Sequence, residues 1–416
     1  MSVREQALKT NRAYQAFLKT GTTRLKNAVL DTIAEQIASD KDYLIRENRK
    51  DLEKGRQDGL SGALLDRLAL DEKRIAGMIG ACREVAALPD PVGKISDMSV
   101  RPEGFRVGRM RTPIGVIGII YEARPNVTVE AAILCMKSGN GVILRGGSSA
   151  FHSNLALVQI LRKALRHHGV PEDLIAALDS TDRKAVDEML VQDDLIHLII
   201  PRGGESLIRS VAEKSRIPVL KHYKGICHVY VDGTADPGMA LRIAVNAKVQ
   251  RPAVCNAMET LLVDEAVAPV FLPDLIRKLQ EAGVEIRGCE RTRAIYGKDV
   301  LPAADADYGA EFLDLILAVR VVSGIDEAIG FINTHGSAHT DAIVTRDVAR
   351  AQQFLNEVDS ASVMVNASTR LSDGGVYGLG AEIGISTDRL HARGPMGLEE
   401  LTTTKWVVMG EGHVRE

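Results

Sequence analysis

A single cysteine stands where thiol chemistry is possible. Cys255 lies in the stretch KVQRPAVCNAMETLLV (248–263), after a proline and just ahead of an apolar run. A free cysteine is by default a small buried hydrophobe, and the helix and strand patterns of the chain predict that role for Cys82, Cys135 and Cys227. Cys255 instead falls in a loop between a predicted helix and a predicted strand, where nucleophiles tend to lie. Its position leaves both packing and nucleophilic attack open.

The stretch YEARPNVTVEA (121–131) offers a polar side chain at the start of a helix. A buried strand ends, Arg-Pro forces an extended turn, and Asn126 opens the next helix. Its side chain either caps that helix or directs an amide donor at a developing oxyanion, and both roles stay open. Arg124, in the same turn, is a candidate contact for a substrate anion.

Two glycine-rich turns follow buried strands: ILRGGSSA (143–150) and IIPRGGESL (199–207). Each runs from a strand to a helix start, so Arg145 and the backbone N–H groups near Gly203 and Gly204 suit a bound phosphate. Neither turn has the GxGxxG, GxxxxGKS or GxxxxGKT spacing of the standard nucleotide motifs. Two such turns at successive strand ends of one sheet predict a ligand site at the carboxyl edge of that sheet.

The elements that would hold these residues are typical of an α/β protein. Residues 3–88 show the helical spacing of apolar residues, and residues 97–112 alternate around Pro-Glu-Gly as a hairpin does. From residue 115, and again from about residue 225, strands that are apolar throughout alternate with helices. That pattern predicts parallel sheets covered on both faces. The tail after residue 400 alternates in polarity and is a candidate edge strand.

Composition and charge exclude several classes of function. The 416 residues carry a formal net charge of −3, so no concentrated basic surface for nucleic acid or an anionic membrane is expected. No apolar run approaches the length of a membrane span, and the start, MSVREQALKTNRAY, lacks the apolar core of a secretory signal. The 5 cysteines have no metal-ligand spacing, which favours a cytoplasmic protein with reduced thiols and no bound metal.

Several motifs together resemble the aldehyde dehydrogenase superfamily. They are YEARPNVT, GNGVILRGG, VQRPAVCNAMETLLV, GLGAEIGIS and LHARGPMGLEELTTTKW, in order along nearly the whole chain. The resemblance implies an aldehyde dehydrogenase-like α/β fold, with two Rossmann-like parallel-sheet domains plus a small β oligomerisation flap. It also implies that Cys255 is the nucleophile and that Asn126 stabilises the oxyanion.

The resemblance further implies a nicotinamide cofactor. Arg145 stands where the superfamily usually has a cofactor-binding lysine, and Ser148 where NAD-preferring members often have a glutamate that holds the ribose 2′-OH. A serine leaves room for a 2′-phosphate, so NADPH is expected; capping of the following helix is the alternative role of Ser148. Glu311 matches a glutamate that holds the nicotinamide ribose, although Leu313 and Asp314 replace the usual Gly-Pro.

One departure from the superfamily bears on the reaction. Hydrolytic members carry a water-activating glutamate upstream of the cysteine, but the corresponding stretch LKHYKGICHVYV (220–231) has no carboxylate. A reductase that takes its acyl group from phosphate needs no activated water, which would destroy its thioester. Arg251, just upstream of the cysteine, is either a positive neighbour that lowers the thiol pKa or simply an exposed arginine.

The expected domain organisation also comes from the resemblance. It places a cofactor-binding domain over residues 1–225, with 97–112 as an oligomerisation hairpin and 366–399 returning to it. A catalytic domain covers 226–365, and a C-terminal oligomerisation strand covers 400–416.

The cysteine motif and the long C-terminal motif are the most specific part of the resemblance. They imply the NADPH-dependent reduction of L-glutamyl 5-phosphate to L-glutamate 5-semialdehyde and phosphate, through a cysteine thioester, in proline biosynthesis. The expected assembly is a homo-oligomer, with glutamate 5-kinase as a transient partner. Two alternatives stay open: another acyl phosphate or aldehyde as the substrate, and a non-catalytic binding protein on the same scaffold.

Overall fold

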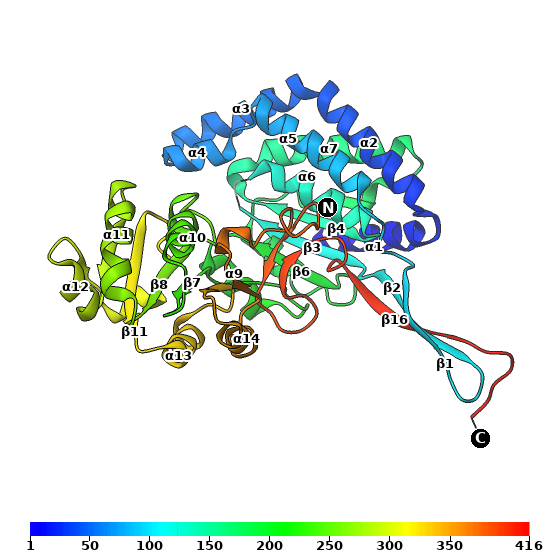
Figure 1. Cartoon of the computed structure of the whole chain (residues 1–416). Coiled ribbons are helices and arrows are strands. Elements are labelled where there is room, and N and C mark those ends of the chain that lie inside the picture. The colour runs from blue at the N-terminus through cyan, green and yellow to red at the C-terminus, as the bar shows by residue number, and fades with distance from the viewer. Residues whose placement is uncertain (123, 416) are drawn as a thin grey trace. The chain divides into compact units, whose positions relative to one another are not determined.

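The computed structural model describes residues 1–122 and 124–415, except for the side chain of residue 63. The chain divides into two compact units (Figure 1). Unit 1 comprises Met1–Lys221, Gly378–Gly384 and Met396–Glu416, and unit 2 comprises His222–Tyr377 and Ile385–Pro395. Each unit contains its own parallel sheet, so the predicted α/β fold class is confirmed.

The amino-terminal part of unit 1 is helical, as predicted. Ser2 caps the first helix through a capping box with Glu5, and apolar residues at four-residue spacing, such as Val29, Ile33 and Ile37, are fully buried. The helices are α1 (Val3–Thr20), α2 (Thr23–Ser39), α3 (Lys41–Gln57), α4 (Gly62–Leu68) and α5 (Glu72–Ala87).

A four-stranded parallel sheet in the order β5-β4-β3-β6 forms the centre of unit 1. Its strand β3 is buried at every position, as a continuous apolar run predicts. The strands are β3 (Val116–Tyr121), β4 (Gly141–Gly146), β5 (Ile175–Ala177) and β6 (Leu198–Arg202). The helices among them are α6 (Pro125–Lys137), η1 (Ser148–Ala150), α7 (Phe151–His167), η2 (Glu172–Leu174), α8 (Arg183–Met189) and α9 (Glu205–Lys214). Sequence analysis missed β5 and α8, which are too short to show a clear period.

A three-stranded antiparallel sheet forms an arm of unit 1 (Figure 1). The predicted hairpin is confirmed as β1 (Ile95–Val100) and β2 (Arg106–Pro113). The predicted edge strand is confirmed as β16 (Thr402–Met409), which pairs with β2 along its whole length. Large apolar side chains on the arm are exposed: Ile95, Met98, Val100, Trp406, Val408 and Met409.

A seven-stranded parallel sheet in the order β10-β9-β11-β8-β7-β12-β13 forms the centre of unit 2. Because β8, β7 and β12 are adjacent, segments far apart in the sequence begin side by side. The strands are β7 (Cys227–Val231), β8 (Met258–Asp264), β9 (Glu285–Gly288), β10 (Leu301–Pro302), β11 (Ile316–Val322), β12 (Thr340–Val344) and β13 (Ser362–Val365).

Helices on both sides of this sheet bury two apolar clusters, as expected for a parallel sheet. They are α10 (Pro237–Val249), α11 (Ala268–Glu281), α12 (Glu290–Tyr296), η3 (Asp305–Gly309), α13 (Ile325–His335), α14 (Val348–Glu357) and η4 (Thr369–Leu371). A further pair of short strands is β14 (Gly384–Ser386) and β15 (Gly394–Met396).

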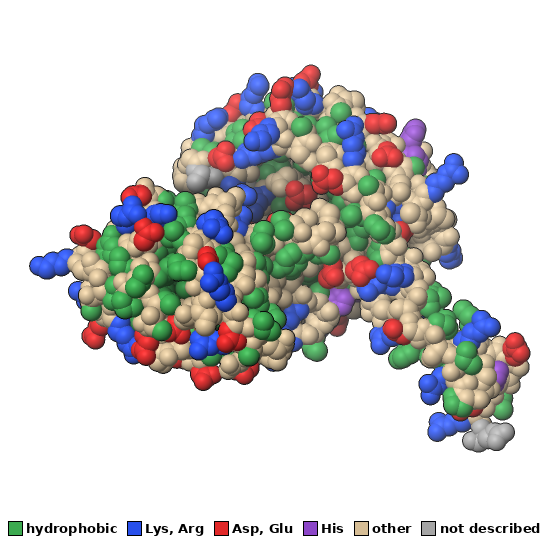
Figure 2. All heavy atoms as spheres, in the orientation of Figure 1, with side chains coloured by type: hydrophobic (Ala, Val, Ile, Leu, Met, Phe, Trp, Pro, Cys, Tyr) green, Lys and Arg blue, Asp and Glu red, His purple; other side chains and the backbone are tan. Residues whose placement is uncertain are grey.

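Basic and acidic side chains are interspersed on the face drawn in Figure 2, in keeping with the small net charge. Among the described residues, no helix is both long enough and apolar enough to cross a membrane.

Candidate active site

Cys255 lies in the loop that joins α10 to β8, as predicted, and its side chain is half-buried. Gly225 packs against the backbone of this loop. A Cβ atom at Gly225 would come within 2.0 Å of the Cys255 carbonyl oxygen, so only glycine fits there. The cysteine is therefore held by a close backbone contact while its thiol keeps access to solvent.

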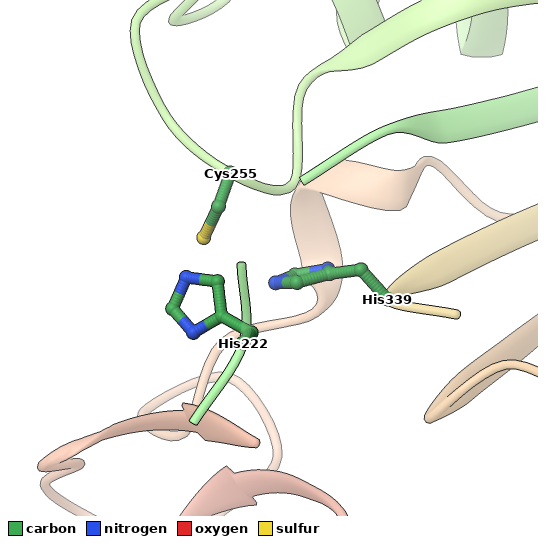
Figure 3. A group of neighbouring side chains, drawn as sticks. All are labelled: His222, Cys255 and His339. Carbon is green, nitrogen blue, oxygen red and sulfur yellow. The ribbon is translucent and has the colours of Figure 1, made fainter. Parts of the chain in front are cut away.

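Two histidines lie beside Cys255 (Figure 3). One donor atom each of His222, Cys255 and His339 lies within 4.8 Å of the other two. We call these three residues the cysteine cluster. Each precedes a strand: His222 comes before β7, Cys255 before β8 and His339 before β12. Because these strands are neighbours, the cluster lies at the amino edge of the unit 2 sheet.

A hydrogen bond to the backbone orients the imidazole of His222. Its Nδ1 lies 2.7 Å from the carbonyl oxygen of Ile385. A carbonyl oxygen only accepts, so Nδ1 carries the proton and Nε2 is left as a base. Figure 3 shows the His222 ring directed at the Cys255 sulfur. The arrangement is that of a thiol beside an oriented base.

His339 is fully buried at the other side of the cluster. Its Nδ1 lies 2.9 Å from Thr340 Oγ1, and the Thr340 hydroxyl donates to Ser372, so the imidazole Nδ1–H donates to Thr340. Nε2 has no hydrogen-bond partner among the described residues. Burial, and then the neighbouring His222, lower the pKa of His339 to about 3, so its imidazole is neutral at physiological pH.

Sequence analysis missed both histidines. His222 lies in the stretch where the water-activating carboxylate was sought and not found, and His339 lies in HTDAIVT, one of the motifs of the family. For His339 the available signal was a polar residue immediately before a buried strand; His222 lies five residues ahead of β7 and had no such signal. That signal carries little information until the neighbours of the strand in the sheet are known.

Two arginines supply positive charge near the cysteine. Arg251 is exposed. Exposure agrees with the prediction that it is a surface arginine and does not test the alternative, that it lowers the thiol pKa. Burial and then the charge of Arg251 lower the pKa of Arg370, whereas Asp373 and Cys255 raise it. Arg370 also hydrogen-bonds to Gln250 at 2.8 Å and to Asn256. Its guanidinium is thus anchored to both flanks of the Cys255 loop and stabilises a thiolate there.

Glu311 is connected to the same loop through Gly225. The Gly225 N–H donates to Glu311 Oε1 at 2.9 Å. Lys248 and Glu259 form a fully buried ion pair, with 2.6 Å between Nζ and Oε2. The other carboxylate oxygen of Glu259, Oε1, accepts a hydrogen bond from the Leu313 N–H at 3.2 Å. Burial raises the pKa of Glu259 to about 7, while Lys248 opposes that shift. The pair ties helix α10 and strand β8 to the Glu311 segment.

A second site lies in unit 1, at the carboxyl ends of β3 and β4. It is a cavity of about 630 Å³ that contains Arg145 and Ser148 together with Arg183, Thr181 and Lys214. The Arg145 Nη2 atom donates to the Thr181 carbonyl at 3.1 Å, and its buried Nε atom has no partner among the described residues. A cavity therefore lies at the edge of the sheet where a ligand site is predicted.

Positive charge in this cavity suits an anionic ligand. Burial and then the nearby Arg183 lower the pKa of Arg145. No ion pair involves either arginine within the described part of the chain. Of the two carboxylates that also line the cavity, Asp187 pairs with Lys214 at 2.8 Å and Glu122 accepts from the Gly204 N–H, so the two arginines repel one another without a paired counter-charge. Phosphate groups of a nucleotide cofactor would relieve that repulsion and pair with the orphaned Nε.

Ser148 does not cap helix α7. It begins the short helix η1, and Ala150 occupies the cap position of α7 without a side-chain hydrogen bond. The capping alternative is therefore wrong, and the exposed hydroxyl of Ser148 stays available in the cavity.

Asn126 does not cap helix α6 either. The helix begins at Pro125, with Arg124 at the cap position, and the Asn126 amide donates to Glu130 Oε1 at 3.0 Å. The capping alternative is wrong here too. Asn126 belongs to unit 1 and Cys255 to unit 2, so the oxyanion role of Asn126 stays a prediction.

The remaining predicted residues lie near the same edge of the unit 1 sheet. Arg124 is exposed, and its N–H donates to the Glu122 carbonyl at 2.6 Å. The Gly204 N–H donates to the Glu122 carboxylate at 3.2 Å, and a Cβ atom at Gly203 would meet that carboxylate at 2.7 Å. The Glu122 carboxylate thus accepts the hydrogen bond from the Gly204 N–H, the group that was predicted to bind a phosphate.

The fold and the cysteine site define the class of this protein. The chain matches the model of the aldehyde dehydrogenase family over residues 3–290, and it belongs to that family. Two curated relatives, both named gamma-glutamyl phosphate reductase, share this similarity over almost their whole length. The relative from Thermodesulfovibrio yellowstonii is 58% identical over 400 residues, which are 96% of each chain. The relative from Geobacter metallireducens is 56% identical over 414 residues, which are 100% of this chain and 99% of the relative.

A solved structure agrees with these matches. The crystal structure of gamma-glutamyl phosphate reductase from Thermotoga maritima is 49% identical, covers 100% of both chains and superposes with a TM-score of 0.98. Within the aldehyde dehydrogenase family, the chain therefore belongs to the gamma-glutamyl phosphate reductases.

Proposed function

We propose that the chain carries out an NADPH-dependent reduction of L-glutamyl 5-phosphate through a thioester on Cys255. The protein is an oxidoreductase of proline biosynthesis that forms glutamate 5-semialdehyde. The observation that best supports the thioester is the half-buried thiol of Cys255 beside the base nitrogen of His222.

The first step needs a thiolate. The Nε2 atom of His222 accepts the thiol proton, because its Nδ1 proton is held by the Ile385 carbonyl. The resulting imidazolium and the nearby guanidinium of Arg370 stabilise the sulfur anion. The thiolate attacks the acyl carbonyl, a C–S bond forms, the acyl C–O bond breaks and phosphate leaves.

The oxyanion formed in this attack needs hydrogen-bond donors. We assign that role to the Asn126 side-chain amide and the Cys255 backbone N–H. Donors that already point at the position of the developing charge stabilise it most. No carboxylate occurs between Leu220 and Val231, where hydrolytic relatives place their water-activating glutamate. The thioester is thereby protected from hydrolysis, and His222 stands in that stretch instead.

Arg145, Ser148 and Arg183 would hold the cofactor in the unit 1 cavity, and Glu311 would hold its nicotinamide ribose. When bound, the cofactor supplies the hydride that reduces the acyl group. The C–S bond of the resulting thiohemiacetal then breaks and releases the aldehyde. His222 returns its proton to the sulfur of Cys255. Arg145 and Arg183 favour NADPH because a 2′-phosphate adds negative charge.

The arm formed by β1, β2 and β16 is our candidate for the oligomerisation surface, because its exposed apolar side chains are unusual for a surface exposed to water. Acyl phosphates hydrolyse readily, so a transient contact with glutamate 5-kinase would shorten the exposure of the substrate to water. A nucleophilic thiol also requires a reducing compartment, which supports a place in the cytoplasm.

The reverse reaction tests the proposal. We expect reduction of NADP⁺ by glutamate 5-semialdehyde to depend on inorganic phosphate, since phosphate must release the acyl group from Cys255. Mass spectrometry without phosphate should detect the acyl group on Cys255 and none on the half-buried Cys289. Turnover that is independent of phosphate, or a faster reaction with another aldehyde in a substrate panel, would contradict the proposed reaction.

A further inference from the structure

We propose that the cysteine cluster is also a zinc site, at which Zn²⁺ reversibly blocks the nucleophile. One donor atom of each of His222, Cys255 and His339 lies within 4.8 Å of the other two, and Figure 3 shows the three side chains converging on one point. A thiolate and two neutral imidazoles are ligands that bind Zn²⁺ in preference to Mg²⁺ or Ca²⁺, which favour oxygen ligands.

The second nitrogen of each histidine is already held as a zinc ligand requires. Imidazoles that bind a metal through one nitrogen nearly always donate the other N–H to an oxygen, which fixes the ring. The Nδ1 atom of His222 donates to the Ile385 carbonyl at 2.7 Å, and that of His339 lies 2.9 Å from Thr340 Oγ1. Nε2 is therefore the unprotonated nitrogen in both rings, the one that can bind a metal ion.

The buried nitrogen of His339 is the second observation that points to a ligand. His339 is fully buried, and its Nε2 has no hydrogen-bond partner among the described residues. A buried polar atom without a partner is destabilising, and a metal ion at the cluster would give it one. Cys227 lies against the other nitrogen, 3.7 Å from Nδ1, and is not a competitor for Nε2.

The geometry needs only a small adjustment. With Zn–S near 2.3 Å and Zn–N near 2.0 Å, tetrahedral ligand atoms are about 3.3–3.6 Å apart. From separations of up to 4.8 Å, the cluster atoms would therefore approach one another by about 1.5 Å at most. Cys255 lies in a loop and is half-buried, so its side chain can make most of that movement.

Zinc binding and the proposed reaction use the same atoms. The ion binds the sulfur of Cys255, the thiol proton leaves to solvent, and no electrons are transferred. A sulfur bound to zinc no longer attacks an acyl carbonyl, and the Nε2 atom of His222 no longer accepts a proton. The binding itself does not depend on the proposed function, whereas the inhibition rests on it.

The test uses the full chain, freed of metal and reduced with a phosphine. Titration with Co²⁺ should give one equivalent of tetrahedral cobalt per chain with a thiolate-to-cobalt absorption band, and Zn²⁺ should remove the band. Cys255→Ser should abolish the band. His222→Ala and His339→Ala should each weaken zinc binding by roughly tenfold or more, measured against a chromophoric chelator. Zn²⁺ should inhibit the wild type, and a chelator should restore activity.

Two variants outside the cluster serve as controls: Cys289→Ser removes another half-buried thiol and His167→Ala an exposed histidine. Binding that is lost in either control and kept in the cluster variants would overturn the zinc site. So would a wild type without the cobalt band, or one that binds zinc and keeps full activity. Thermal melting of each variant separates loss of ligand from loss of fold. A chain that binds cobalt but never reduces the acyl phosphate would contradict the proposed function alone.

Discussion

The cavity of unit 1 and the cysteine cluster of unit 2 lie at opposite edges of their parallel sheets. The cavity follows the last residues of β3 and β4, whereas the cluster precedes the first residues of β7, β8 and β12. At the carboxyl edge, helix starts and glycine turns provide N–H groups, which suit phosphates. At the amino edge, the functional groups are side chains contributed by neighbouring strands. The anion site and the thiol chemistry that we propose would thus use different edges of similar sheets.

The two regions also differ in how their charges are compensated. Arg145 and Arg183 line the cavity without an ion-pair partner among the described residues, as the proposed binding of an anionic cofactor requires. Near the cysteine, charges are already paired or anchored: Lys248 binds Glu259, and Arg370 binds two side chains beside the loop. The first region is organised to bind, and the second to hold a reactive group in place.

The largest effect is expected from Cys255→Ser, which replaces a single sulfur by oxygen. We expect kcat to fall on the order of 10³-fold or more, because a serine hydroxyl is a far weaker nucleophile than a thiolate. Cys289→Ser is the matched control and should keep its activity. If the Cys255 variant retained more than a few per cent of the wild-type kcat, the thioester would be refuted and the cluster would lose its catalytic role.

His222→Ala should follow, with kcat lower by about 10²–10⁴-fold, the usual range for a general base. Alkylation of Cys255 by iodoacetamide at a fixed pH should slow as well, because the other imidazole of the cluster, His339, has a pKa lowered to about 3 and is too weak a base to replace His222. A residue that only supported the fold would change the melting temperature and leave the alkylation rate alone. Unchanged alkylation would therefore assign His222 a structural role.

Asn126→Ala distinguishes catalysis from stability. A lost oxyanion donor should lower kcat by about 10²–10³-fold. Asn126 is not a helix cap, and within the described ranges its side chain hydrogen-bonds to Glu130 alone, so the stability loss should stay below about 0.5 kcal/mol. Measuring kcat and the urea midpoint on the same variant compares the two effects. A normal kcat with reduced stability would remove Asn126 from the catalytic residues.

The smallest effect is expected in the cavity, from Ser148→Glu. A carboxylate beside the 2′ position repels a 2′-phosphate and accepts a hydrogen bond from a free 2′-OH. The ratio of kcat/KM for NADPH over NADH should fall by more than about tenfold, and Arg145 should keep the shift partial. Ser149→Glu, on the neighbouring residue of the same cavity, is the control. An unchanged ratio, or a wild type that already prefers NADH, would exclude this assignment of Ser148.

Much of the fold and part of each site could be predicted from the sequence. Continuous apolar runs predicted β3 and β8 as buried strands, and the arm was expected from alternation around Pro-Glu-Gly. Arg145 was a candidate because a strand, a turn and a helix start are contiguous in the chain, whereas Ser148 was a candidate only through the family resemblance; both line the unit 1 cavity. Cys255 was found for a similar reason, since its loop between helix and strand is a local feature.

The partners of that cysteine were decided by the tertiary structure. His222 and His339 meet Cys255 only because β8, β7 and β12 are neighbours in the sheet, and strand order is set by packing between distant segments. The predicted helix-cap roles of Asn126 and Ser148 were wrong for a related reason. The residue at which a helix begins is set by backbone hydrogen bonds, and the preferences of single residues only make one start more favourable than another. The sequence by itself determined which elements form and where a thiol is placed between them. Only the folded sheet decided which base stands beside that thiol, because contacts between distant strands leave no periodic trace in the chain.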